Sequence, residues 1–116
     1  MMIEITSNVH EKLTQELRRG ILVLAALSQL HEARYGYALI DELSSRGLEI
    51  DQGTLYPLLR RLEDQGLLES EWNVEGSRPR RYYKISAAGE ELLQELIDEW
   101  RSLVGVMEGL LFQEKE

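Results

Sequence analysis

Two short helix patterns that end in the same way constrain the fold of this chain most strongly. The first covers residues 35–46 and ends at Gly47; the second lies in "DQGTLYPLLRRLEDQG", residues 51–66, and ends at Gly66. A leucine follows each glycine, which is a common end of a helix. Because only "GLEID" joins them, they predict a helix-turn-helix. The apolar positions that form one face of each helix are Leu39, Ile40, Leu43, Leu55, Leu58, Leu59 and Leu62.

A longer helix is predicted on either side of this pair. The first covers residues 9–30, with Asn8 as its N-cap, and is apolar on nearly every side from 20 to 27. A small domain offers too little cover for that stretch, so a partner subunit is expected to help. The last helix covers 87–112, with Ser86 as its N-cap.

The last helix carries the spacing of a coiled coil, with apolar residues alternating three and four positions apart. Such a stripe extends beyond a small core and favours self-association, although the helix could instead fold back onto its own domain. The predicted dimer contacts are Leu93, Leu96, Trp100, Leu103, Met107 and Leu110.

Residues 67–74 and 80–86 alternate as strands do, around the turn-rich "EGSRP". Period two places Leu68, Ser70 and Trp72 on one face of the first strand. On the second strand it places Arg81, Tyr83 and Ile85 on one face and Arg80, Tyr82 and Lys84 on the other.

The complete order is helix, helix, helix, β-hairpin, helix. It predicts a mainly α fold with a small β-hairpin: a winged helix-turn-helix over residues 1–86, followed by a dimerisation helix over 87–116. In such a fold the second helix of the helix-turn-helix enters the major groove of DNA, and the hairpin, or wing, reaches the neighbouring backbone.

The net charge of −8 does not exclude this function, because the charge is unevenly distributed. Residues 87–116 hold 8 acids and 2 bases, whereas residues 51–86 hold 6 of each. The chain has no cysteine, no apolar run long enough for a membrane and no visible cleavable signal, so a cytoplasmic protein is expected. His10 and His31 have no patterned catalytic or metal-ligating partner. No enzyme, cofactor or metal site is therefore expected.

The presumed recognition helix contains Gly53 and Pro57, the residues least suited to a helix interior. Proline is tolerated in a first turn, so the regular helix is predicted to begin near Thr54, where free N–H groups favour a phosphate. The residues of this helix that are expected at the DNA are Gln52, Thr54, Tyr56, Pro57, Arg60 and Arg61. Without a wing, the same residues could be a turn followed by a solvated face.

The wing favours nucleic acid. "RPRRYYK", residues 78–84, holds four positive charges and no acid, with two tyrosines between them. This composition is typical of a segment that follows phosphates, although charged edge strands also prevent aggregation. The expected DNA contacts are Arg78, Arg80, Arg81 and Lys84.

The stretches "YGYALIDEL", "GTLYPLLRRLEDQGLLESEW" and "RPRRYYKIS" together resemble the PadR family of bacterial transcriptional regulators. The resemblance runs from about Ile21 to Trp100. It implies a homodimer, usually a repressor, that binds a palindromic operator in double-stranded DNA. It also places Tyr35, Gly36 and Tyr37 near DNA phosphates, whereas from the residues alone both tyrosines could be half-buried aromatics.

Short members of that family bind flat aromatic drugs between their subunits, against a tryptophan of the C-terminal helix. Trp100 has a similar place here, although it could simply fill the dimer seam. The candidate pocket residues are Leu13, Leu17, Trp100 and Met107, and nearby acids would favour cationic aromatics. The alternative to a DNA-binding regulator is a winged-helix module that binds a protein.

Overall fold

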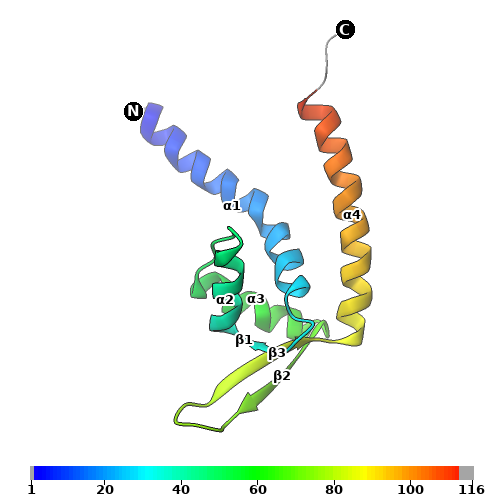
Figure 1. The fold of residues 1–116 in the computed structure, drawn as a ribbon. Coiled ribbons are helices and arrows are strands. Elements are labelled where there is room, and N and C mark those ends of the chain that lie inside the picture. Colours follow the sequence, from blue (N-terminus) through cyan, green and yellow to red (C-terminus); the bar gives the residue numbers. More distant parts are fainter. Residues whose placement is uncertain (1, 113–116) are drawn as a thin grey trace.

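The computed structural model describes residues 2–112 and has four helices and one antiparallel sheet within them (Figure 1). The sheet order is β1-β3-β2. The elements are α1 (Met2–Ser28), β1 (Arg34–Tyr35), α2 (Gly36–Ser45), α3 (Gln52–Asp64), β2 (Leu68–Asn73), β3 (Arg80–Ile85) and α4 (Ala87–Leu111). The predicted order of three helices, a hairpin and a further helix is confirmed. Residues 113–116 of the predicted dimerisation segment lie outside the described part.

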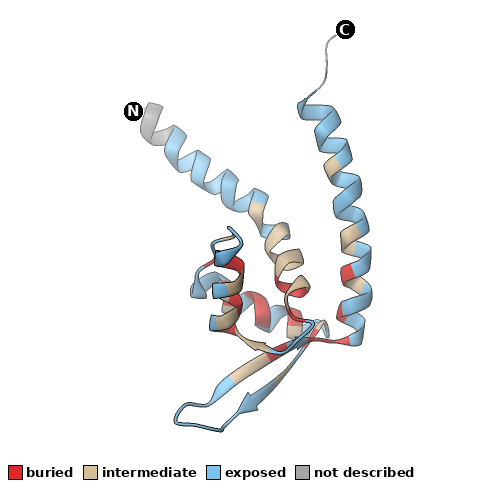
Figure 2. Cartoon of the chain, viewed as in Figure 1, coloured by how far each residue is buried: buried red, intermediate tan, exposed pale blue. Residues whose placement is uncertain are grey.

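Leucine side chains of α1, α2 and α3 meet the base of the wing and the start of α4 in one core (Figure 2). Burying them from water is the main force that holds these elements together. The residues that are most completely buried are Leu27, Leu30, Leu39, Leu55, Leu59, Leu62 and Leu93.

The wing has the predicted faces. Leu68 pairs with Ile85, Ser70 with Tyr83 and Trp72 with Arg81, so all six point to the same side of the hairpin. Tyr83, Leu68 and Ile85 reach the core, and residues 71–80 are exposed throughout.

Three predicted boundaries were wrong. Asn8 lies inside α1, because no glycine or proline precedes Gly20 to interrupt the helix. Arg34 and Tyr35, predicted as a connection and a helix start, form β1 and pair with Tyr83 and Tyr82. A two-residue strand is too short to show alternation in the sequence.

The third correction concerns α3, which begins at Gln52 and not near Thr54. The Asp51 carboxylate accepts a hydrogen bond from the Thr54 N–H at 2.8 Å and so caps a helix that starts earlier. Pro57 therefore lies past the first turn, where it removes the bond that its N–H would have made to the carbonyl of Gly53. Both residues lie on the exposed face of α3.

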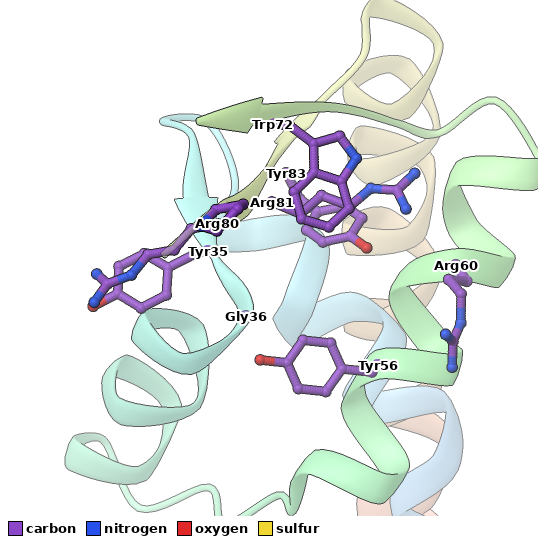
Figure 3. A pocket seen from close by; sticks show the side chains of 9 residues that line it. Tyr35, Gly36, Tyr56, Arg60, Trp72, Arg80, Arg81 and Tyr83 are labelled. Atoms are coloured by element: carbon purple, nitrogen blue, oxygen red, sulfur yellow. The ribbon is translucent and has the colours of Figure 1, made fainter. Parts of the chain in front are cut away.

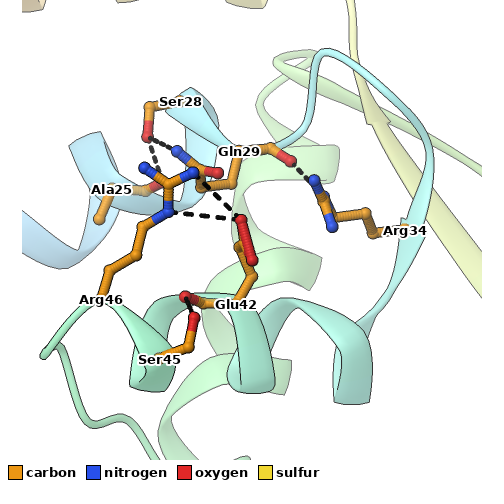
Figure 4. Close-up of polar contacts among 7 residues, drawn as sticks. All are labelled: Ala25, Ser28, Gln29, Arg34, Glu42, Ser45 and Arg46. Carbon is orange, nitrogen blue, oxygen red and sulfur yellow. Dashed lines mark hydrogen bonds and ion pairs between the residues drawn. The ribbon is translucent and has the colours of Figure 1, made fainter.

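The short β1 is fixed to the end of α1 by a side chain. The Arg34 Nε–H donates to the carbonyl of Gln29 at 2.9 Å (Figure 4). This contact holds Tyr35 beside the wing, since Tyr35 is also the N-terminal boundary residue of α2.

Ser86 joins three elements at the base of α4. Its hydroxyl accepts from the Gly89 N–H at 3.0 Å, as predicted for an N-cap, and donates to the carbonyl of Gly66 at 2.7 Å. Its own N–H donates to the carbonyl of Leu67. The start of α4 is thereby fixed to the end of the helix-turn-helix.

Beyond this joint α1 and α4 diverge, and their outer parts leave the core (Figures 1 and 2). The side chains on these outer parts include large apolar ones that are exposed: Val9, Leu13 and Leu17 on α1, and Trp100, Leu103, Val106, Met107, Leu110 and Leu111 on α4.

Candidate nucleic-acid interface and apolar groove

The exposed face of α3 carries the polar residues predicted for DNA contact. Gln52, Thr54, Arg60 and Arg61 are all exposed, while the leucines of the opposite face are buried. The helix tip differs from the prediction in one respect. The Asp51 carboxylate already binds the Thr54 N–H, so this donor is not free for a phosphate.

Gly36 is buried beneath the ring of Tyr56. A Cβ at position 36 would lie 2.4 Å from the Cε1 atom of Tyr56, closer than two carbon atoms can approach. Gly36 therefore serves the packing of α2 against α3. Tyr56 is half-buried, whereas Tyr37 is 52% exposed.

The wing divides its basic residues between its two faces. Arg78, Arg80 and Lys84 are exposed. The Arg80 guanidinium stacks on the Tyr35 ring at 4.6 Å, and the Tyr35 ring meets the Tyr82 ring edge-on at 5.6 Å. Stacking of this kind orients a guanidinium and leaves its N–H groups free to donate.

Arg81 has a different environment. Its Nη2–H donates to Glu63 of α3 at 2.9 Å, and its Nε–H donates to the Ser70 hydroxyl at 2.9 Å. The guanidinium also lies 5.7 Å from the Trp72 ring and 5.6 Å from the Tyr83 ring. Arg81 thus has partners within the chain, unlike the exposed Lys84 of the same strand.

A hollow of about 410 Å³ separates the wing from α2 and α3 (Figure 3). Arg60 from α3 and Arg80 from β3 both line it, so two of the predicted DNA contacts border one hollow from opposite sides. Trp72 also lines it and is 62% exposed. Alternation along the strand predicts the face on which Trp72 lies, but no motif in the sequence predicts a role for it. Its remaining lining residues are Tyr35, Gly36, Tyr56, Pro79, Arg81 and Tyr83.

Burial raises the pKa of the Tyr83 phenol, and the nearby positive charge of Arg81 opposes this shift. A phenol with a raised pKa stays neutral at physiological pH. The side of the hollow formed by Tyr83 therefore carries no negative charge.

A second, apolar groove of about 570 Å³ lies between α1 and α4. It brings together Leu17, Trp100 and Met107 of the candidate pocket, but Leu13 is not among its lining residues. Of the predicted dimer contacts, Leu93 packs in the subunit's own core, and Leu96 is half-buried beside that core. The large apolar side chains that remain exposed on α4 are Trp100, Leu103 and Met107, which line the groove, together with Val106, Leu110 and Leu111.

Two further observations hold within the described residues. No helix there is long and apolar enough to cross a membrane. No group of three or more His, Cys, Asp or Glu side chains there is placed to hold a metal ion.

Residues 23–95 match the family described as "Transcriptional regulator PadR-like family". This segment includes α2, α3 and the whole wing, together with the start of α4. The chain belongs to the PadR-like family of transcriptional regulators.

Individual PadR-like relatives agree with this assignment. A transcriptional regulator of Mycobacterium tuberculosis is 44% identical over 79 residues, which is 68% of this chain and 70% of the relative. The crystal structure of a PadR family transcriptional regulator from Eggerthella lenta is 44% identical, with a TM-score of 0.86 over 96% of this chain and 99% of that one. A PadR-like transcription factor from Bacteroides fragilis is 35% identical, with a TM-score of 0.73 over 85% and 98%. The likeness therefore includes the winged-helix fold.

Proposed function

We propose that this PadR-like chain is a homodimeric repressor that binds a palindromic operator in double-stranded DNA. The observation that supports this proposal best is the hollow between α3 and the wing, which Arg60 and Arg80 line from opposite sides. A helix in the major groove and a wing on the neighbouring backbone would bring phosphates to such basic side chains. The acidic residues that dominate the net charge lie mainly on α4, away from this surface.

The dimer proposal rests on the outer halves of α1 and α4. Exposed apolar side chains on both helices form a surface that is unusual for a soluble monomer. Leu17, for example, is 73% exposed although it faces the apolar groove. A second copy of the chain would cover these side chains, and a two-fold symmetric dimer would present two recognition helices to a palindromic site.

The wing provides the test of DNA binding. Arg80→Ala combined with Lys84→Ala should weaken binding to operator DNA and reduce its salt dependence, because each lost phosphate contact reduces the slope of log K against log salt by about one. The control is Arg46→Ala combined with Arg101→Ala, which also removes two exposed positive charges. Fluorescence anisotropy at several salt concentrations measures both quantities. If the wing variant bound DNA as tightly as the unchanged protein at low salt, a protein-binding module would be the better interpretation.

We further propose that a flat, cationic aromatic compound releases the repressor by binding at the α1–α4 groove. The groove is lined by apolar side chains and Trp100, and its one acidic lining residue is Glu99. Trp100 can stack on a flat ring, and Glu99 would favour a positive charge. Titration with planar cationic dyes should quench the Trp100 fluorescence of a Trp72→Phe variant and release DNA. Quenching without release would rule out the regulatory role.

A further inference from the structure

We propose that Glu63, Ser70 and Arg81 form a clamp that fixes the wing against the recognition helix. Arg81 then supports DNA binding through this clamp and not by contact with DNA. The inference rests on the proposed DNA-binding function and assigns positioning roles within that surface. It also explains how Glu63, an acidic residue of α3, could support the binding of negatively charged DNA.

The clamp joins three elements through three side chains. Glu63, near the end of α3, accepts from Arg81 of β3 with Oε1 at 2.9 Å and from Ser70 of β2 with Oε2 at 2.5 Å. The Arg81 Nε–H donates to the same Ser70 hydroxyl at 2.9 Å. Each of the three contacts the other two, so both strands of the wing are bound to α3 at a single point.

Arg81 also contacts two aromatic rings. Its guanidinium lies between the rings of Tyr83 and Trp72, 5.6 Å and 5.7 Å from their centroids. Both rings share its face of the hairpin because Trp72 pairs directly with Arg81 and Tyr83 follows two positions later. With these contacts and two hydrogen bonds, Arg81 would have to leave several partners to reach a phosphate. Lys84, on the other face of the strand, has no such network among the described residues, and Arg80 there would leave its stacking on Tyr35 but no hydrogen-bond network.

The position of the clamp along the wing explains why it is needed. The buried residues of the hairpin are Leu68, Tyr83 and Ile85, all at its base, and residues 71–80 are fully exposed. The outer part of the wing therefore contributes no buried side chain to the core, and Arg80 there stacks on Tyr35. The clamp lies where the core ends, with Glu63 and Arg81 side chains that are 25% and 36% exposed. A charge-assisted network at that place limits the angle at which the outer hairpin leaves the core.

Glu63→Gln distinguishes the clamp from simple electrostatics by the sign of its effect. Removing an acid near DNA should strengthen binding if only charge matters. If the clamp positions the wing, the variant should instead bind operator DNA about tenfold more weakly, because the ion pair with Arg81 is lost and the new NH2 group cannot accept a hydrogen bond as the second carboxylate oxygen does. The matched control is Glu71→Gln, which removes an exposed acid of β2 from the opposite face. This control should bind DNA as well as or better than the unchanged protein.

The salt dependence of binding tests the role of Arg81. Arg81→Gln should weaken binding with no change in the slope of log K against log salt, whereas Arg80→Gln should reduce the slope by about one for each lost phosphate contact. Stronger binding by Glu63→Gln, or a smaller slope for Arg81→Gln, would overturn the proposal.

Hydrogen exchange of the free protein separates this inference from the proposed function. Glu63→Gln should speed amide exchange in the hairpin, residues 69–82, and leave the core of α3 and α1 unchanged. If the unchanged protein bound no duplex DNA, the repressor proposal would fail, and this measurement would still decide the clamp. Unchanged exchange in the hairpin would contradict it.

Discussion

Single residues of the proposed DNA-binding surface differ in exposure, and their expected roles differ accordingly. Arg60, Arg80 and Lys84 are exposed and available to a polyanion. Gly36 and Arg81 were also predicted to contact DNA, but both have partners within the chain. Gly36 packs beneath the Tyr56 ring, and Arg81 forms an ion pair with Glu63. Their contribution to binding would therefore come through the shape of the surface.

Gly36→Ala should destabilise the protein by about 1–3 kcal/mol, because its new Cβ requires the Tyr56 ring to move out of a packed position. The control is Gly53→Ala in α3, where the nearest atom to a new Cβ is 3.6 Å away. Alanine is the better helix former, so the control should be as stable as the unchanged protein or more so. Urea unfolding measures both. If the Gly36 variant were as stable as the unchanged protein, the packing of the Tyr56 ring would not require a glycine at position 36.

At the scale of helices and strands, local sequence patterns predict some element bounds better than others. Leucine spacing and the glycine–leucine ends predicted α2 and α3 to within two residues. The start of α3 was placed too late, because Pro57 suggested a first turn while Asp51 provides a cap that supports an earlier one.

Asp51→Asn tests how this cap affects recognition. The asparagine side chain can still accept from the Thr54 N–H, so the free energy of unfolding should change by less than about 0.5 kcal/mol. The variant removes a negative charge from the tip of the recognition helix, and DNA should therefore bind more tightly, most clearly at low salt. Thermal unfolding and anisotropy measure the two effects. Weaker DNA binding at unchanged stability would mean that the Asp51 carboxylate itself contacts DNA.

Sequence reasoning predicted the side of the wing on which Arg81 lies but not what it binds. Period two is a local property, so the faces of β2 and β3 follow directly from alternation. The partner Glu63 lies 18 positions earlier on a helix, and the contact depends on how far α3 extends beside the hairpin. The strand β1 was missed for a similar reason, since its two residues are defined by their pairing with β3.

At the scale of the whole molecule, two surfaces have separate tasks. The hollow between α3 and the wing is basic and aromatic, and the groove between α1 and α4 is apolar. Ser86 connects the two regions, because its hydroxyl bonds both the end of the helix-turn-helix and the start of α4. If the proposed ligand changed the angle of α4, Ser86 would pass that change to the end of the helix-turn-helix, beside the wing.

Leu103→Lys should prevent dimer formation and weaken DNA binding at the same time. The substitution places a charge on the exposed apolar face of α4 that borders the groove, where a partner subunit would bury it at a large cost. The control is Gln94→Lys, which adds the same charge at an exposed polar position of α4. Sedimentation of both variants measures their oligomeric state. A Leu103→Lys variant that stayed dimeric would place the dimer seam elsewhere.

The most direct measurement of the central claim is the selection of binding sites from random duplex DNA by the unchanged protein, with the mass of the selected complex. A two-fold symmetric motif bound by two chains is the predicted result, because paired recognition helices would read equal half-sites. Recovery of no motif, or of an asymmetric site bound by one chain, would contradict the dimeric repressor.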